Sequence, residues 1–255
     1  MKKLFVFSNL LRGQNPIHKF KIILTSISIL LLLSSVSESM GYFYYDVLNN
    51  DPVDSTALNI KIAKAYGIDA FSKVKKIEYT FNVEFNGKKF NRKWEWFSKT
   101  KDITYWGKDS TGKDITLSYN QNKSMDSQTK KIDAQFINDN YWMLFPFHLA
   151  WDNNVTFKDE GMKKYPINKG EGRTLMVKYS NKVGYTPGDA FELYLDKSNK
   201  IKEWIYFNGG NTKHPGPATW EGNKDFNGIT ISTMHYGPGK KFKLFFSDIN
   251  VEYEK

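Results

Sequence analysis

The residue pair whose types and spacing best suit catalysis is His148 with Asp152. The two lie four positions apart, so on a helix they would share one face. A carboxylate placed there could orient the imidazole for general base catalysis. The same pair also commonly forms a local hydrogen bond that closes a helix, which is the structural alternative. Asp189 follows a Pro-Gly turn and would form a glycosidase-like pair with Asp152 only if the fold brought both carboxylates together.

The other histidines do not suggest a metal site. His235 lies on the apolar side of a predicted strand, where a lone histidine is usually a buried core residue, and His214 lies in a polar loop. The sequence has no cysteine and no His-x-x-x-His spacing. It also lacks a G-x-S-x-G elbow, a phosphate loop and a dinucleotide fingerprint. We therefore assign no catalytic residue, no metal and no cofactor.

The composition favours a sheet protein without a nucleic-acid partner. Aromatic residues make up 16% of the chain and suit the half-buried surface of a β-sheet. The net charge is +10; residues 1–39 contain five basic residues and one acidic residue, so the rest has 32 basic and 26 acidic residues, or +6. These charges form no arginine-rich run. The mildly basic surface fits either solubility or transient contact with anionic membrane lipids.

The first 39 residues have the pattern of a signal peptide. Residues 22–36 carry no charge and follow several basic residues, as expected for a basic region and a short apolar region. The apolar run is shorter than the roughly 20 residues that a spanning helix needs. We expect cleavage after Ser37 or Ser39, a linker over residues 40–53, and export to the periplasm or the cell envelope. The alternatives are an uncleaved membrane anchor and a different start site.

No repeat or low-complexity segment divides the remainder, so we expect one domain over residues 54–255. Its first helix is predicted to begin at Asp54 or Ser55, which are good capping residues. Gly67 occupies the position where a glycine ends a helix. A second short helix is predicted over residues 69–75.

The strongest local signal is a β-hairpin. Residues 77–85 alternate strictly between apolar and polar side chains, and Asn86-Gly87 follows, the favoured two-residue hairpin turn. The predicted register places three apolar pairs on one face: Val83 with Phe90, Tyr79 with Trp94, and Ile77 with Trp96.

Further hairpins follow the same pattern, and they predict an antiparallel meander. Turn residues separate each pair of strands, and no alternating helices occur between them. The predicted strand pairs are residues 103–108 with 113–119, 191–196 with 200–207, and 220–226 with 229–236, followed by a last strand over residues 241–253.

Residues 136–151 interrupt this pattern because they are apolar on nearly every side. We predict a short helix there, capped by Asn138 or Asp139 and kinked or restarted by Pro146. A helix that is apolar all round must be covered on every side. It therefore either fills the core or lines a pocket.

These elements together are similar to the LolA/LolB-like lipoprotein-carrier superfamily. The similarity covers roughly residues 54–253 in the order of elements, and the segments that carry it are YWMLFPFHLAWD (141–152), VGYTPGDAFELYLD (183–196), IKEWIYF (201–207) and the run 219–233. It implies an α+β fold of mostly antiparallel β structure. In that fold, a strongly curved, half-open β-barrel wraps around an N-terminal helix and a short apolar helical insertion.

The resemblance also implies an arginine on the concave face of an early strand, where it tethers the helical lid. Arg92 takes this position, opposite Phe81 in the predicted hairpin. An unpaired guanidinium on an apolar face is costly, so it would need carboxylate or carbonyl partners. The alternative is that Arg92 lies near the sheet edge and extends its charge into water.

We expect an exported binding module that shelters an apolar ligand, since one short helix would not fill so long a curved sheet. The expected partner is a lipid or an acylated protein. The alternatives are that the aromatic residues are simply core, that the chain is a hydrolase using His148 with Asp152 or Asp189, or that it is a membrane-tethered structural protein of the envelope. The candidate ligand-binding residues are Tyr79, Phe81, Arg92, Trp94, Trp96, Tyr141, Trp142, Phe145, Phe147, His148 and Trp151.

Overall fold

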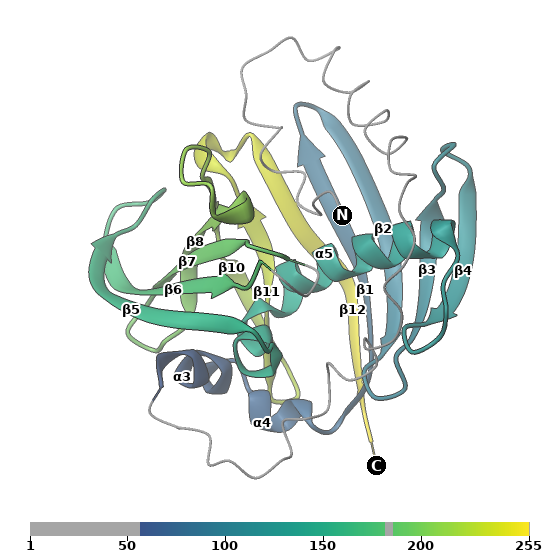
Figure 1. Ribbon diagram of the computed structural model, residues 1–255, viewed down its shortest axis with the longest axis horizontal. Coiled ribbons are helices and arrows are strands. Elements are labelled where there is room, and N and C mark those ends of the chain that lie inside the picture. The colour runs from purple at the N-terminus through teal and green to yellow at the C-terminus, as the bar shows by residue number, and fades with distance from the viewer. Residues whose placement is uncertain (1–56, 182–185, 255) are drawn as a thin grey trace.

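The computed structural model describes residues 57–181 and 186–254 (Figure 1). The predicted leader and linker and the expected capping residues Asp54 and Ser55 lie outside them. The described strands form two antiparallel sheets. The larger has the order β10 (Glu221–Phe226), β11 (Ile229–Tyr236), β12 (Phe242–Tyr253), β1 (Val74–Phe85), β2 (Lys88–Phe97), β3 (Asp102–Lys108) and β4 (Asp114–Asn120). The smaller has the order β5 (Val155–Lys164), β6 (Glu171–Tyr179), β7 (Ala190–Leu195), β8 (Ile201–Phe207) and β9 (Gly216–Thr219).

The first hairpin has the predicted register, with Val83 opposite Phe90 and Tyr79 opposite Trp94. Asn86 and Gly87 both have positive φ, 49° and 76°, as a type I′ turn requires. The second Asn-Gly turn, between β10 and β11, has the same signs of φ. Local turn chemistry and side-chain alternation therefore determine these hairpins.

The predicted antiparallel hairpins of neighbouring strands are present, but they divide between two sheets, because the first strand also pairs with the last. β1 is hydrogen-bonded along its length to β12, with Phe81 opposite Phe246. This pairing places β1–β4 and β10–β12 in one sheet and leaves β5–β9 to form the second. The sequence does not predict β5, β6 or β9. In β5 the reason is that most side chains are exposed or half-buried, so apolar alternation is weak.

The apolar segment belongs to a much longer helix than predicted. α5 runs from Ser127 to Trp151, and its cap is Asp126, whose carboxylate accepts a hydrogen bond from Thr129 N at 2.7 Å. Asn138 and Asp139 are therefore inside the helix. The expected kink is present: Leu144 has non-helical angles, φ −119° and ψ 17°, because Pro146 offers no N–H to the preceding turn.

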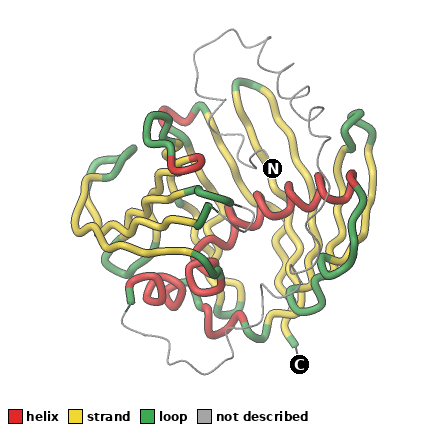
Figure 2. The backbone as a smooth tube through the Cα atoms, in the orientation of Figure 1, coloured by secondary structure: helices red, strands yellow, loops and turns green. Residues whose placement is uncertain are grey.

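The helix lies across the concave side of the larger sheet and extends toward the smaller one (Figures 1 and 2). Its exposed first turns contain polar side chains, and burial becomes almost continuous from Asp139 onward. Its last half contacts α3 (Leu58–Ala65), where Asn59 Nδ2 donates to Leu149 O at 3.0 Å. One hydrophobic cluster joins α5 to both sheets. The α+β, mostly antiparallel and half-open architecture is thus confirmed.

The N-terminal helices are shorter than predicted. α3 begins after Ala57 without a side-chain cap, and α4 covers only Ile68–Phe71. Residue 74 already belongs to β1, because the pairing with β12 extends to Tyr253. Gly67 ends α3 with φ 90°, and a Cβ there would lie 1.9 Å from the Gly228 carbonyl oxygen. Only glycine fits this close approach.

His235 is fully buried, as expected of a core residue. Its ring lies edge-on to Trp142 and Trp220, and its Nδ1 lies 3.0 Å from the Thr219 carbonyl oxygen. A carbonyl can only accept, so Nδ1 carries a proton. Burial lowers the pKa of His235 to about 3, so the ring is neutral in the folded protein.

This neutral histidine predicts a loss of stability in acid. Below pH 6.5, His235 becomes protonated in the unfolded chain but stays neutral in the folded protein. The free energy of unfolding therefore falls by about 1.4 kcal/mol per pH unit as the pH decreases toward the folded pKa. His235→Gln keeps an N–H donor but cannot titrate, and we expect its stability to depend less on pH between 6.5 and 5 in urea unfolding. His214→Gln, at an exposed loop position, is the control. Equal pH slopes for wild type and His235→Gln would contradict this account.

Candidate functional site

The centre of the candidate site is an ion pair between Arg92 of β2 and Asp139 of α5. Arg92 Nε donates to Asp139 Oδ2 at 2.6 Å, and Nη2 donates to Oδ1 at 2.7 Å. This two-pronged geometry is the strongest form of a carboxylate–guanidinium contact. The structure therefore provides the carboxylate partner that the position of Arg92 requires, and that partner is on the helix.

Further donors complete the environment of the Asp139 carboxylate, which has no exposed surface. Trp94 Nε1 donates to Oδ2 at 2.8 Å, and Asn138 Nδ2 donates to Oδ1 at 3.0 Å. Gln135 contributes an acceptor to Arg92, with Nη1 donating to its Oε1 at 3.0 Å. The buried charges are thus hydrogen-bonded on several sides, as burial of charge demands.

Two phenylalanines flank the guanidinium. Its carbon lies 4.9 Å from the ring centre of Phe81 and 5.7 Å from that of Phe90, within the range of cation–π attraction. Burial opposes the charge, but the neighbouring Asp139 carboxylate raises the pKa of Arg92 above its usual value. The arginine is therefore charged although it lies on an aromatic face.

Exposure falls steeply along the concave side of β2. Phe90 is 51% exposed, the Arg92 side chain 16%, and Trp94 and Trp96 are 0% and 1% exposed. The face therefore leads from an open apolar end, past one charge, to a closed aromatic interior. The helix closes that interior with Phe136, whose ring centre lies 5.4 Å from that of Trp94.

The predicted aromatic residues fall into two groups. Tyr79, Phe81, Trp94 and Trp96 lie on the larger sheet, as expected. Those of the helix segment mostly pack elsewhere: Phe145 lies 4.5 Å from Phe191 of β7, and Trp142 lies 4.6 Å from Trp204 of β8, measured between ring centres. Phe147 stacks on Trp151. The helix residues that do face β2 are Gln135, Phe136 and Asp139, which the sequence analysis did not select.

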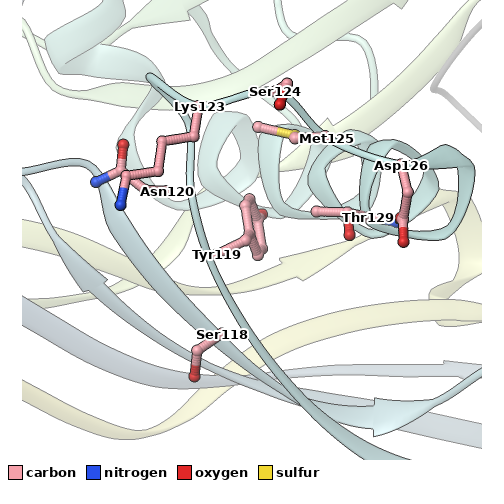
Figure 3. A pocket seen from close by; sticks show the side chains of 8 residues that line it. All are labelled: Ser118, Tyr119, Asn120, Lys123, Ser124, Met125, Asp126 and Thr129. Carbon is pink, nitrogen blue, oxygen red and sulfur yellow. The ribbon is translucent and has the colours of Figure 1, made fainter.

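The interior beneath residues 136–151 is closed in this state. Side chains from Trp142 to Phe145 are at most 2% exposed. Two surface recesses, each of about 570 Å³, lie elsewhere, and neither is lined by these residues. The first lies between the end of β4 and the start of α5, where Tyr119 and Thr129 face each other (Figure 3). A guest under the helix would therefore have to displace side chains that are now in contact.

His148 and Asp152 form the expected hydrogen bond, 2.9 Å between Nδ1 and Oδ1. The other carboxylate oxygen accepts hydrogen bonds from the hydroxyls of Tyr141, at 2.6 Å, and Tyr179 of β6, at 2.8 Å. Burial opposes ionisation of Asp152, but His148 and the two hydroxyls hold the pKa of the carboxyl below its usual range. This network fastens the end of α5 to the smaller sheet.

The geometry of this network favours the structural alternative over catalysis. The second ring nitrogen of His148 lies 2.9 Å from Asn140 Oδ1, so both nitrogens have partners within the protein. The histidine is 4% exposed, and Tyr141 stacks on it at 3.9 Å. The Asp189 carboxylate has a different partner, Gly209 N at 2.6 Å. No position next to the imidazole is left open for a substrate among the described residues.

Comparison with solved structures identifies distant similarities. A DUF1329 family protein from Desulfovibrio piger is 11% identical, with a TM-score of 0.42, over 76% of this chain and 93% of that one. A putative outer membrane lipoprotein-sorting protein domain from Vibrio parahaemolyticus is 10% identical, with a TM-score of 0.38, over 69% and 85%. The Mycobacterium tuberculosis lipoprotein LppX is 8% identical, with a TM-score of 0.29, over 77% and 97%. No family model and no curated protein matches the chain.

The described part of the chain contains no cluster of three or more His, Asp or Glu side chains that could hold a metal ion. Within residues 57–181 and 186–254, no helix is both long and apolar enough to span a membrane.

The Asp152 network predicts a large effect on stability. Asp152→Asn should lower the free energy of unfolding by roughly 2–4 kcal/mol, because it removes the charge that His148, Tyr141 and Tyr179 surround. Asp114→Asn breaks an exposed ion pair with Lys108 and should leave stability essentially unchanged. Urea unfolding measures both. If His148→Ala left stability intact while abolishing a hydrolytic activity, the structural interpretation would be wrong.

Proposed function

We propose that this chain is an exported binding module that shelters a lipid, or the acyl chain of a lipoprotein, between the concave face of the larger sheet and the N-terminal half of α5. The half-helix acts as a lid, and Arg92 tethers it. The observation that carries the proposal is the Arg92–Asp139 ion pair, which joins lid to sheet within an aromatic face.

The contact between lid and sheet is an ion pair, Arg92 with Asp139, and this supports a lid that opens. Apolar side chains of similar volume usually hold two surfaces together as well as a buried ion pair or better. A charge pair defines one closed position, and each charge can be satisfied by another partner after the helix moves. Such a contact suits a joint that is made and broken more than one that is permanent.

The helix is also divided where a hinge would be needed. Leu144 interrupts its geometry, and the segment beyond it is fastened through His148, Asp152 and Tyr179 to β6. The segment before it holds Phe136 and Asp139 against β2. Movement at the kink would uncover Trp94 and Trp96. It would also break two hydrogen bonds that cross the kink, from Tyr141 to Asp152 and between Asn140 and His148.

The energies favour a long-chain ligand. Separating a buried ion pair costs roughly 3–5 kcal/mol. An acyl chain gains about 0.8 kcal/mol for each methylene group that it buries. About four to six buried methylenes would offset the broken pair, so a lipid tail has enough apolar surface to hold the lid open.

The hinge predicts a kinetic effect of Pro146. Pro146→Ala restores a backbone donor and should stiffen the kink, so the full-length protein should bind the fluorescent probe N-phenylnaphthylamine about tenfold more slowly with little change in stability. Stopped-flow fluorescence measures the rate. Pro238→Ala, in the short helix Pro238–Lys240, is the matched control. A wild-type protein that neither binds the probe nor retains lipid in native mass spectrometry after purification from its host would refute the carrier function.

Export and release predict the mature N-terminus. A leader cleaved after Ser37 or Ser39 leaves Glu38 or Met40 as the first residue, which N-terminal sequencing of the exported protein detects. A freely exchanging carrier requires this cleavage. An intact leader in the membrane fraction would favour the tethered structural protein instead.

A further inference from the structure

Three of the donors around Asp139 form a carboxylate-binding cradle that belongs to the sheet. Arg92 Nε, Arg92 Nη2 and Trp94 Nε1 donate to it at 2.6, 2.7 and 2.8 Å. All three donors project from β2, while the carboxylate comes from α5. When the helix moves, the cradle stays with the sheet and its occupant leaves with the lid.

An emptied cradle creates a specific requirement for the ligand. A guanidinium and an indole N–H left unpaired on an aromatic face are costly. A neutral lipid tail lying over them would bury both without a partner. A ligand that carries its own anion would restore the contacts that Arg92 and Trp94 made with Asp139.

We infer that the cradle of Arg92 and Trp94 binds the carboxylate head group of a single-chain fatty acid, and that Asp139 is a built-in competitor which occupies the cradle when no ligand is present. This inference rests on the proposed function and specifies its ligand. The closed state thus inhibits ligand binding, because the lid carboxylate and the ligand compete for the same donors.

The geometry matches a carboxylate better than a phosphate. Two oxygens receive three hydrogen bonds from β2, with both prongs of Arg92 engaged. A phosphate would bring a further oxygen and additional charge into a space where the nearby groups are Phe81 and Phe90 rings. That extra oxygen would face apolar surface, which disfavours it.

The gradient of exposure along β2 sets the orientation of the ligand. Arg92 lies on the side of the exposed Phe90, while Trp94 and Trp96 are closed off. An amphiphile places its head nearer to water and its chain in the apolar interior. The carboxylate would therefore lie at Arg92, and the chain would run along Trp94 and Trp96 in the space that Phe136 fills in the closed state.

The test compares amphiphiles that share one chain and differ in the head group. Dodecanoate and dodecanol are titrated into the full-length protein at mildly alkaline pH, followed by tryptophan fluorescence and calorimetry, with acetate as an anion that has no chain. The wild type should bind dodecanoate at least about tenfold more tightly than dodecanol, and acetate should not compete.

Three variants assign this preference to the cradle. Asp139→Asn removes the competing charge and should tighten dodecanoate binding about tenfold. Arg92→Gln should abolish the preference for dodecanoate over dodecanol. Arg173→Gln, on β6 with its partner Asp159 on β5, is the matched control and should retain it. If Arg92→Gln fails to fold, Trp94→Phe serves instead. It removes one donor and should weaken the binding of dodecanoate but not that of dodecanol.

The outcomes separate the inference from the function on which it rests. If no amphiphile binds, the proposed function itself fails. Equal affinities for dodecanoate and dodecanol leave the carrier function standing and overturn the cradle. Competition by acetate would show a simple anion site, and weaker dodecanoate binding in Asp139→Asn would show that Asp139 helps rather than competes; either result overturns the inference.

Discussion

The rest of the structure depends on placing one guanidinium on the apolar side of a curved sheet. Strand alternation directs Arg92 to the same face as Phe81 and Trp94, where its side chain is mostly shielded from water. A carboxylate must therefore come from whatever covers that face, and Asp139 of α5 supplies it. Apolar packing would tolerate several positions of the helix, but a two-pronged hydrogen bond tolerates one. The ion pair thus sets the register of the helix on the sheet.

The sheet can present this face because the chain closes on itself. β1 pairs on one side with β2 and on the other with β12, which places the longest described strands side by side at the centre of the larger sheet (Figure 1). The smaller sheet is not hydrogen-bonded to either edge of the larger one among the described strands. Side chains rather than a hydrogen-bonded ladder join the two sheets, and α5 lies between them. The barrel is therefore half open.

The sequence predicts the local parts of this architecture and fails on the long-range parts. Asn-Gly turns and strict alternation define the first hairpin without help from the rest of the chain, so its register and the place of Arg92 could be read directly. Short polar residues favour the capping position, so the sequence predicts Asp139 as a helix cap. The true cap is Asp126, and burial of Asp139 beside Arg92 overrides the local preference.

The pairing of β1 with β12 joins residues more than 150 positions apart, and no local pattern encodes it. The spacing of His148 and Asp152 predicts their hydrogen bond. It does not reveal that Asp152 also binds Tyr179 of the smaller sheet, and this contact favours a structural role over an oriented catalytic base.

The two ends of α5 differ in how they are held, and the difference has a physical cause. Beyond the kink, Phe145 packs on Phe191, His148 and Asp152 bind each other and Tyr179, and Asn59 binds the Leu149 carbonyl; apolar contact and hydrogen bonds from three elements act together there. Before the kink, specific attachment to β2 depends on Arg92, with Trp94 and Gln135 as supporting partners. Because residues in one network lose their energy together, exchanging the Asp139 carboxylate for another anion would loosen the contact of the first half with β2. The first turns would still be held at the end of β4, where Asp133 accepts hydrogen bonds from Tyr119 and Gln121. A single exchange of partners at Arg92 therefore weakens one specific contact of the first half, whereas contacts from several elements hold the second half.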